Sequence, residues 1–336
     1  MSAPKSGSDD RGKEAPFASL SFDLMLDALL ELGLEGDGTL VALNSYENRV
    51  YQVGIEGKSP VIVKFYRPNR WSDAQILEEH AFTLELAERE IPVVPALDIG
   101  GNTLHHAKQF AFAVFERRGG RAPDIEHPET LAWLGRFLGR IHAVGALKRY
   151  AVRPTLDLAT FGEEPRAWLL KSDFIPKELR ESYAAISALA LEGVRNQLSS
   201  TPTTTQRVHG DCHIGNVLWT DSGPHFVDFD DSRMAPAVQD LWMLLSGSRD
   251  DQAIQMRAIL SGYQEFADFD IGQLRIIEAL RTLRLVHYSA WLARRWHDPA
   301  FPSAFPWFAS VRYWEERISE LRDQIAALSD EPLSVY

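Results

Sequence analysis

The spacing of apolar residues changes along the chain from a helical period to a strand period and then back to a helical one. Leucines recur every three or four positions over residues 22–34, which predicts a helix that ends near Gly33 or Gly36. Runs rich in β-branched and aromatic residues follow, separated by polar turns, so the sequence predicts a three-stranded meander. These runs are residues 40–43, 50–53 and 61–66.

A second helix is expected from Ser72, which suits the N-cap position, to about Arg89. Its apolar side is predicted to consist of Ile76, Leu77, His80, Ala81, Leu84 and Leu86. Prolines at positions 92 and 95 end this helix, and short strands are expected at residues 96–99 and 110–115. The N-terminal third is therefore predicted to be a small sheet with one main helix.

The rest of the chain is predicted to be mostly helical, apart from one β-hairpin. Helical spacing predicts a helix over residues 129–145. Further helices are expected at about residues 165–171, 176–198, 238–246, 251–266 and 271–296. The hairpin would pair residues 217–219 with 225–229 across a turn-like segment. Aromatic residues after position 290 are expected in core packing or in the wall of an acceptor groove.

Length, composition and net charge exclude several classes of protein. A chain of 336 residues with 45% hydrophobic residues indicates two domains or one bilobed unit with a sizeable interior. The net charge of −12 argues against a general nucleic-acid binder. One cysteine excludes an internal disulfide, and the absence of a long apolar run or a secretory leader favours a cytoplasmic protein. We expect residues 1–19 to be a disordered tail.

The side chains with the clearest chemistry lie around the predicted hairpin. Asp211, Asn216 and Asp228 fall within eighteen residues. Mg²⁺ takes one or two protein oxygens together with phosphate oxygens, so Asn216 and Asp228 are candidate metal ligands. Asp211 would then accept a proton from an attacking hydroxyl group. The predicted chemistry is phosphoryl transfer.

Lys64 is a further candidate because it lies in the apolar run VIVKFY, where an unpaired ammonium group would be costly. We therefore expect an anion beside it. Glu78 and Glu79 in the following helix are both candidates for this partner, and an exposed helix face is the alternative position for either glutamate.

These residues also carry a family resemblance. His209, Asp211 and Asn216 form the pattern H-x-D-x-x-x-x-N, which resembles the catalytic loop of the aminoglycoside phosphotransferase and choline kinase-like superfamily, distant relatives of protein kinases. The VDFD segment at 227–230 stands where protein kinases have D-F-G. Longer strings, among them LNSYENRVYQ, VKFYRPNRW and HGDCHIGNVLW, resemble the stress response kinase A family of bacterial serine/threonine protein kinases. Such strings are spread over nearly the whole chain.

The resemblance implies a protein kinase-like α+β fold with two lobes. The small β-sheet lobe would span residues 20–116, the hinge 117–120, and the larger, mainly helical lobe 121–336. The resemblance further implies that Ser45 and Lys64 contact ATP, that Glu79 holds Lys64, that Asp211 is the base, and that Asn216 and Asp228 hold Mg²⁺. The loop that contains Ser45 has no glycine, in contrast to the phosphate loop of protein kinases.

The implied activity is ATP-dependent phosphorylation of serine or threonine in proteins, with autophosphorylation, a role in the stress response and a monomeric chain. A kinase for a small amino alcohol or an aminoglycoside-like acceptor is an alternative, and so is a catalytically inactive nucleotide-binding regulator. A metallohydrolase is a third alternative, with metal ligands His209, Asp211, His213 and Asp228. Asp240 is expected to brace the loop at 209–216, and Cys212 to pack beneath that loop.

Overall fold

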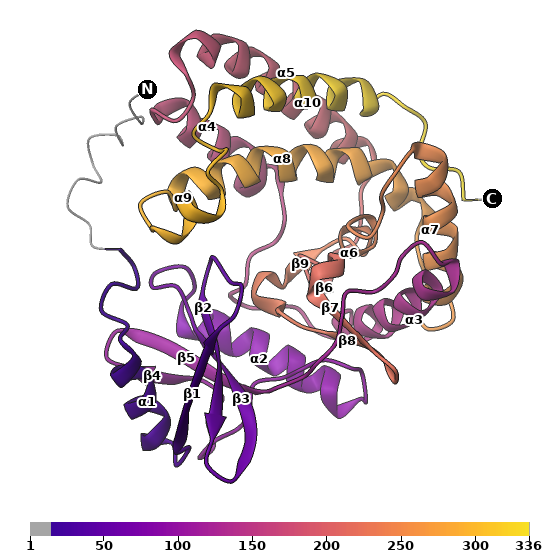
Figure 1. The fold of residues 1–336 in the computed structure, drawn as a ribbon. Coiled ribbons are helices and arrows are strands. Elements are labelled where there is room, and N and C mark those ends of the chain that lie inside the picture. Colours follow the sequence, from indigo (N-terminus) through magenta and orange to yellow (C-terminus); the bar gives the residue numbers. More distant parts are fainter. Residues whose placement is uncertain (1–14, 336) are drawn as a thin grey trace. The chain divides into compact units, whose positions relative to one another are not determined.

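The computed structural model describes residues 15–335, so the predicted tail lies outside the described residues for positions 1–14. The chain forms two compact units, which can be followed by sequence colour in Figure 1. The mixed unit comprises residues 16–154 and 205–269, and the helical unit comprises residues 155–204 and 270–334. At the end of the predicted tail, Phe17 is buried and stacks on Phe110, so it is part of the core. The lobe and hinge boundaries stay predictions.

The mixed unit contains a five-stranded antiparallel sheet in the order β1-β2-β3-β5-β4. Its strands are β1 (Gly36–Ala42), β2 (Arg49–Ile55), β3 (Lys58–Phe65), β4 (His105–Ala107) and β5 (Phe110–Glu116). The predicted meander is β1 to β3. The strand expected at 96–99 is wrong, because Ala96 and Ile99 form isolated bridges there. The sequence pattern also misses β4, whose tight turn places Lys108 at a φ of 53°, where glycine or asparagine is usual.

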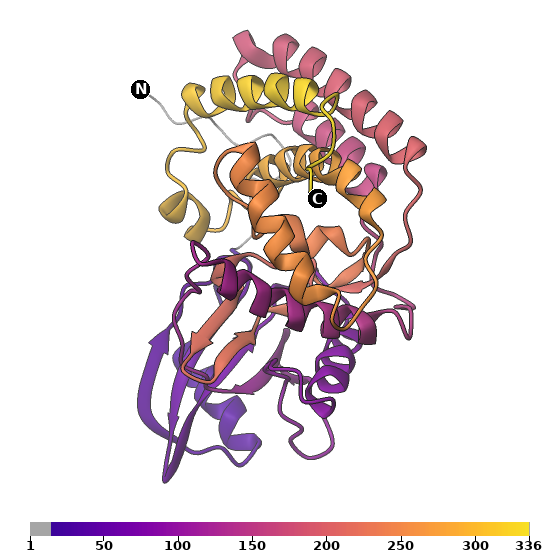
Figure 2. The same ribbon diagram turned by 90° about the vertical axis from the view of Figure 1, so that its right-hand side faces the viewer.

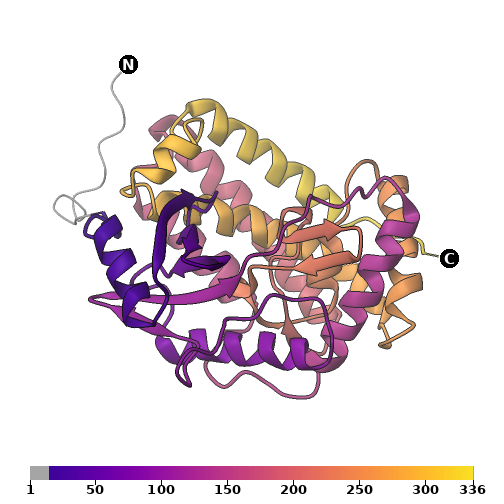
Figure 3. The same ribbon diagram turned by 60° about the horizontal axis from the view of Figure 1, so that its bottom comes forward.

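The two faces of this sheet are covered by different helices. These are α1 (Phe22–Glu31) and α2 (Asp73–Glu88), which run beside the sheet in Figure 3. Val63 and Phe65 belong to the core on the α1 side. Ala113, which pairs with Lys64 across β3 and β5, packs with Ile76 of α2. Because side chains alternate along a strand, Lys64 is directed to the α2 face.

Helix α2 begins after Ser72, as predicted, and Ser72 forms a capping box with Gln75. The predicted apolar side is wrong at Leu77, Ala81 and Leu84, which are exposed. The buried residues are Ile76, Glu79, His80, Phe82, Thr83 and Leu86. Polar residues can occupy this face because their groups have partners: the Nε2 atom of His80 lies 2.8 Å from the Tyr66 hydroxyl, for example. Glu79 therefore lies on the buried face of α2.

The remaining elements of the mixed unit carry the candidate chemistry. They are α3 (Pro128–Gly145), β6 (Gln206–Val208), β7 (Val217–Thr220), β8 (Gly223–Phe226), β9 (Arg233–Ala235), α6 (Val238–Trp242) and α7 (Arg249–Tyr263). Helices α3 and α7 lie side by side in Figure 2, with direct backbone contact. A Cβ atom on Gly135 would lie only 2.0 Å from the carbonyl oxygen of Ile259, so this contact requires glycine.

The predicted hairpin is present as β7 and β8, which are antiparallel. Its turn consists of two residues, and β8 ends at Phe226, earlier than expected. Asp228 has a φ of 61° and a ψ of 60°, a left-handed conformation that cannot continue a strand. The chain therefore turns at Asp228 and enters a short 3-10 helix, η3 (Phe229–Asp231).

The helical unit consists of η1 (Ala159–Glu163), α4 (Glu164–Lys171), α5 (Lys177–Ser200), η4 (Ile271–Ile276), α8 (Ile277–Arg294), α9 (Ala300–Ala304) and α10 (Val311–Ala327). Helices α5, α8 and α10 pack against one another (Figure 1). Helix α10 is not among the helices predicted from the sequence. The expected core packing of aromatic residues is confirmed for Phe301, Phe308 and Trp314, whereas Trp307 is exposed. Among the described residues, no helix combines the length and the apolar character needed to span a membrane.

Candidate active site

The loop between β6 and β7 is held by a buried carboxylate, Asp240 of α6. Asp240 accepts hydrogen bonds from the backbone N–H groups of His209 at 2.7 Å and Gly210 at 2.8 Å. Its Oδ2 atom also lies 3.0 Å from Nε2 of His142. Burial acts to raise the pKa of Asp240, but the contacts with His142 and with these N–H groups hold it below its usual value. Asp240 is therefore ionised and braces the loop, as predicted.

Hydrogen bonds join this loop to the segment after β8. The Nε2 atom of His209 lies 2.9 Å from the carbonyl oxygen of Val227, and the Val227 N–H donates to the carbonyl oxygen of Asn216 at 3.0 Å. The side-chain amide of Asn216 donates to the carbonyl oxygen of Asp211 at 3.0 Å. The structure thus brings Asp211, Asn216 and Asp228 together, although Asn216 and Asp228 are twelve positions apart in the sequence.

The chemistry of Asn216 and Asp228 fits a hard divalent cation. The Asn216 NH₂ group is hydrogen-bonded to the backbone, so the amide oxygen is the donor that it can offer to a metal. The side chain of Asp228 is 54% exposed, and its left-handed backbone lies just after the hairpin. One amide oxygen and one carboxylate are suitable Mg²⁺ ligands when phosphate and water complete the coordination shell.

The four ligands of the metallohydrolase alternative do not form a metal site in the described residues. Among residues 15–335, no group of three or more His, Cys, Asp and Glu side chains is arranged to hold a metal ion. His209 instead bridges the loop to Val227, and its ring packs 4.4 Å from that of Phe229. Cys212 is fully buried, and burial raises the pKa of its thiol well above the usual value, as expected for a packed cysteine.

Lys64 is the main cation next to the candidate metal ligands. Its Nζ atom lies 2.8 Å from Oδ1 of Asp228 and 3.5 Å from Oδ1 of Asp230. Burial acts to lower the pKa of Lys64, but the carboxylates of Asp228, Asp230 and Glu79 outweigh burial and raise it. Lys64 is therefore charged, and the anion expected beside it is present.

The two adjacent glutamates of α2 have different surroundings. Glu78 accepts hydrogen bonds from the backbone N–H groups of Ala151, Val152 and Arg153, at 2.6, 3.0 and 2.9 Å. Glu79 is buried on the face that Lys64 approaches. Burial raises the pKa of Glu79 to about 7, although the charges of Arg153 and Lys64 act in the opposite direction. Within the described residues the side chains of Glu79 and Lys64 form no ion pair shorter than 4.0 Å, because the close contacts of Lys64 are with Asp228 and Asp230.

Ser45 lies in the glycine-free loop between β1 and β2. Its hydroxyl group donates to the carbonyl oxygen of Asn48 at 3.2 Å. The side chain of Asn48 is buried, accepts from the Arg67 N–H at 3.0 Å and donates to Oδ2 of Asp230 at 3.1 Å. The guanidinium group of Arg67 donates to the carbonyl oxygens of Tyr46 and Glu47. Side chains therefore hold this loop where a kinase loop would use glycines.

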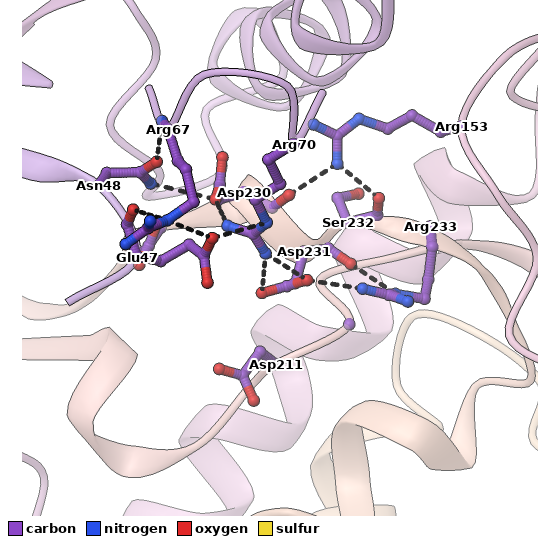
Figure 4. A network of polar contacts seen from close by, with 12 residues as sticks. Glu47, Asn48, Arg67, Arg70, Arg153, Asp211, Asp230, Asp231, Ser232 and Arg233 are labelled. Carbon is purple, nitrogen blue, oxygen red and sulfur yellow. Dashed lines mark hydrogen bonds and ion pairs between the residues drawn. The ribbon is translucent and has the colours of Figure 1, made fainter. Parts of the chain in front are cut away.

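A network of arginines and carboxylates beside Asp211 was not predicted from the sequence (Figure 4). Arg70 pairs with Asp230 and donates to both carboxylate oxygens of Asp231 at 2.9 Å. Arg153 donates to the carbonyl oxygens of Asp230 and Ser232, at 2.9 and 2.7 Å. The available sequence signal was the succession of three aspartates in VDFDD, which requires nearby cations if more than one of them is buried.

The chain is similar to known phosphotransferases over most of its length. The model of the phosphotransferase enzyme family matches residues 39–277. The chain is 43% identical over 319 residues to stress response kinase A of Escherichia coli K12, and the match covers 95% of this chain and 97% of that protein. Over the same shares it is 42% identical to the serine/threonine protein kinase RdoA of Salmonella typhimurium.

Solved structures identify the fold. An amicoumacin kinase in complex with AMP-PNP and Ca²⁺ superposes with a TM-score of 0.72 at 19% identity, covering 95% of this chain and 96% of that one. A microcompartment-associated aminopropanol kinase gives 0.70 at 18% identity, covering 94% and 100%. The predicted kinase-like α+β fold is thereby confirmed. The roles of the individual site residues stay predictions.

Proposed function

Because the chain belongs to the phosphotransferase enzyme family, and within it to the stress response kinase A family, we propose that it is an ATP-dependent serine/threonine protein kinase. It would transfer the γ-phosphoryl group of ATP to a protein hydroxyl. The observation that carries this proposal is the hydrogen bond from the Val227 N–H to the Asn216 carbonyl oxygen, which joins the two segments. As a result, Asn216 contacts the Asp211 backbone while the neighbouring Asp228 contacts Lys64. This is the set of groups that phosphoryl transfer from ATP requires.

Four residues would act directly in phosphoryl transfer, namely Asp211, Asn216, Asp228 and Lys64. Asp211 accepts the proton of the serine or threonine hydroxyl while the new O–P bond forms and the bond between the β- and γ-phosphates breaks, releasing ADP. Asn216 and Asp228 would hold Mg²⁺, which neutralises charge on the transferred phosphoryl group. Lys64 orients the phosphates.

Glu79, Ser45 and the hinge support the transfer in this proposed function. Glu79 pairs with Lys64 once the ammonium group has left Asp228. Ser45 contacts the nucleotide from the β1–β2 loop, which Asn48 ties to Asp230. Residues 117–120 are the hinge between a small lobe at 20–116 and a larger one from 121. Mg²⁺ as the physiological ion, autophosphorylation, a role in the stress response, a monomeric state and a cytoplasmic location are further parts of the same proposal.

The acceptor class rests on the curated relatives. Proteins at 42–43% identity over 95% of this chain are named as a stress response kinase and as a serine/threonine protein kinase. The solved structures are kinases named for amicoumacin and aminopropanol, at 19% identity or less. That lower identity supports the fold and leaves a small-molecule acceptor as the second candidate.

Labelled ATP tests the acceptor directly. The protein is incubated with Mg²⁺, γ-labelled ATP and a generic basic protein, and in parallel with a panel of amino alcohols. We expect label on the added protein and on the chain itself. Label found only on an amino alcohol would contradict a protein acceptor. Stabilisation by Mg·ATP without any transfer would contradict the enzymatic role and favour a nucleotide-binding regulator.

A further inference from the structure

Three carboxylates follow one another at the candidate metal site, and they differ in exposure. The side chain of Asp228 is 54% exposed, that of Asp231 33% and that of Asp230 4%. A divalent cation is attracted to any carboxylate that is not already neutralised, and two or three adjacent carboxylates bind it more tightly than one. A divalent cation can therefore bind best at a carboxylate whose charge is not already neutralised by an arginine or lysine.

Arg70 contacts two of these three carboxylates. Its Nη1 atom pairs with Oδ2 of Asp230, and its Nη2 atom lies 2.9 Å from both oxygens of Asp231 (Figure 4). Asp231 has a second guanidinium partner in Arg233, at 2.6 Å. Within the described residues the cation paired with Asp228 is Lys64. The planar guanidinium group can contact two carboxylates at once, which a single ammonium group cannot do with the same geometry.

The backbone and neighbours of Arg70 hold its side chain in this orientation. Arg70 lies in the linker from β3 to α2, where Asn69 has a φ of 63° and the Arg70 N–H donates to the Arg67 carbonyl oxygen at 3.3 Å. Its Nε atom lies 3.7 Å from Oε1 of Glu47, and its guanidinium carbon lies 5.3 Å from the centre of the Trp71 ring. The side chain is 12% exposed. These contacts therefore hold the guanidinium group in a largely buried position with a fixed orientation.

The contact with Arg70 neutralises the charge of Asp230, whose side chain is only 4% exposed. Its Oδ1 atom is buried and has no hydrogen-bond partner, and Nζ of Lys64 is 3.5 Å away. Without Arg70, the negative charges of Asp230 and Asp231 would compete with Asp228 for Lys64 and for any divalent cation nearby.

We propose that Arg70 is a positioning residue that neutralises Asp230 and Asp231 and so leaves Asp228 as the carboxylate of this segment that is open to a divalent cation. This inference rests on the proposed function, in which Asp228 holds the metal. Arg70 itself touches neither the nucleotide nor the metal in this account. Arg70 prevents tight binding of a divalent cation to the carboxylates of residues 228–231 when no nucleotide is present.

Binding of Mn²⁺ to the full-length chain without nucleotide tests this inference, with the EPR signal of free Mn²⁺ as the readout. We expect Arg70→Met to bind Mn²⁺ at least about tenfold more tightly than the parent chain, because Asp230 and Asp231 become available. The double variant Arg70→Met/Asp231→Asn should reverse part of this gain. The control is Arg136→Met, which removes an exposed arginine–carboxylate pair with Glu265 and should leave Mn²⁺ binding unchanged.

Circular dichroism shows whether each variant is folded. A folded Arg70→Met variant with unchanged Mn²⁺ affinity would overturn the inference. If that variant does not fold, Arg70→Lys decides: it keeps the charge and loses the two-carboxylate contact, so we expect at least about threefold tighter Mn²⁺ binding, and unchanged affinity would overturn the inference.

A second pair of measurements separates this inference from the proposed function. Asp228→Asn should abolish Mn²⁺ binding that depends on ATP. If it does not, the metal assignment in the proposed function is wrong. If it does, and the Arg70 variants bind Mn²⁺ like the parent chain, only the role of Arg70 is wrong.

Discussion

The Nζ atom of Lys64 lies 2.8 Å from Oδ1 of Asp228, so the cation proposed for phosphate binding and the carboxylate proposed for metal binding contact each other in this structure. Each compensates the charge of the other in this contact. In the proposed function, Mg·ATP would replace this pair with two charged partners, phosphate for Lys64 and metal for Asp228. Lys64 would then pair with Glu79, which is buried on the face of α2 that Lys64 approaches.

Asp228→Asn should separate stability from function. The Asp228 side chain is more than half exposed, and the buried Lys64 keeps Asp230 at 3.5 Å, so losing the pair should lower the free energy of unfolding by only about 1–3 kcal/mol. Turnover should fall at least about 100-fold, because the metal loses its carboxylate ligand. Thermal melts with and without Mg·ATP, together with a transfer assay, measure these effects. Persistent Mg²⁺-dependent stabilisation by ATP would contradict the assignment, and Asp221→Asn in the exposed hairpin turn is the control.

Asp211→Ala should abolish transfer and leave ATP binding largely intact. General bases contribute on the order of 10²–10⁴ to rate, so we expect a loss of turnover in that range. The loop should keep its conformation, because the hydrogen bond from Asn216 is to the backbone carbonyl of Asp211. Equilibrium binding of ATP and single-turnover transfer measure the two properties separately. Near-normal turnover would show that another group accepts the proton.

The protonation of Glu79 should make stability depend on pH. Its pKa is raised from 4.5 to about 7 by burial, so between these values the folded state binds more protons than the unfolded state. Stability contributed by the protonated group is therefore complete below pH 4.5 and is lost as pH rises to about 7. Glu79→Gln removes this loss. Relative to the parent chain, its unfolding free energy should be higher at pH 8 than at pH 4.5 by on the order of 3 kcal/mol.

Chemical denaturation of both proteins at the two pH values measures this difference. A difference between the two proteins that does not change with pH would show that burial does not raise the pKa of Glu79. The same variant should transfer phosphate poorly at every pH, because glutamine cannot form the charged pair with Lys64.

Glu78→Gln should destabilise the protein without directly removing a group from the active site. The Glu78 carboxylate accepts three backbone hydrogen bonds from residues 151–153, and hydrogen bonds to a charged group are worth about 1.5–3 kcal/mol each at most. We expect a loss of about 2 kcal/mol in unfolding free energy, because glutamine keeps part of these bonds. Urea denaturation measures it. Glu88→Gln, at an exposed position on the same helix, should have almost no effect.

The parts of this protein that are predictable from sequence are those whose chemistry is local. Asp211, Asn216 and Asp228 lie in one short segment, and oxygen donors at that spacing are enough to indicate a metal–phosphate site. The meander and the Ser72 cap follow from periodicity and from capping chemistry. The family resemblance and the fold are confirmed by the relatives and the solved structures.

The parts that the sequence could not reveal depend on contacts between distant residues. Arg70 and Asp230 are 160 positions apart, and nothing near Arg70 in the sequence shows that its partners are carboxylates of the segment proposed to bind metal. The predicted apolar side of α2 was partly wrong because Glu79 and Thr83 are polar but buried, whereas Leu77 and Leu84 are exposed. Hydropathy alone cannot identify polar residues that are buried with partners.

A crystal structure with AMP-PNP and Mg²⁺ tests the central claim most directly. We predict the amide oxygen of Asn216 and a carboxylate oxygen of Asp228 within about 2.0–2.1 Å of the metal, with Nζ of Lys64 moved from Asp228 to the phosphates. A metal–nucleotide complex bound away from Asn216 and Asp228, with Lys64 still paired to Asp228, would contradict the account.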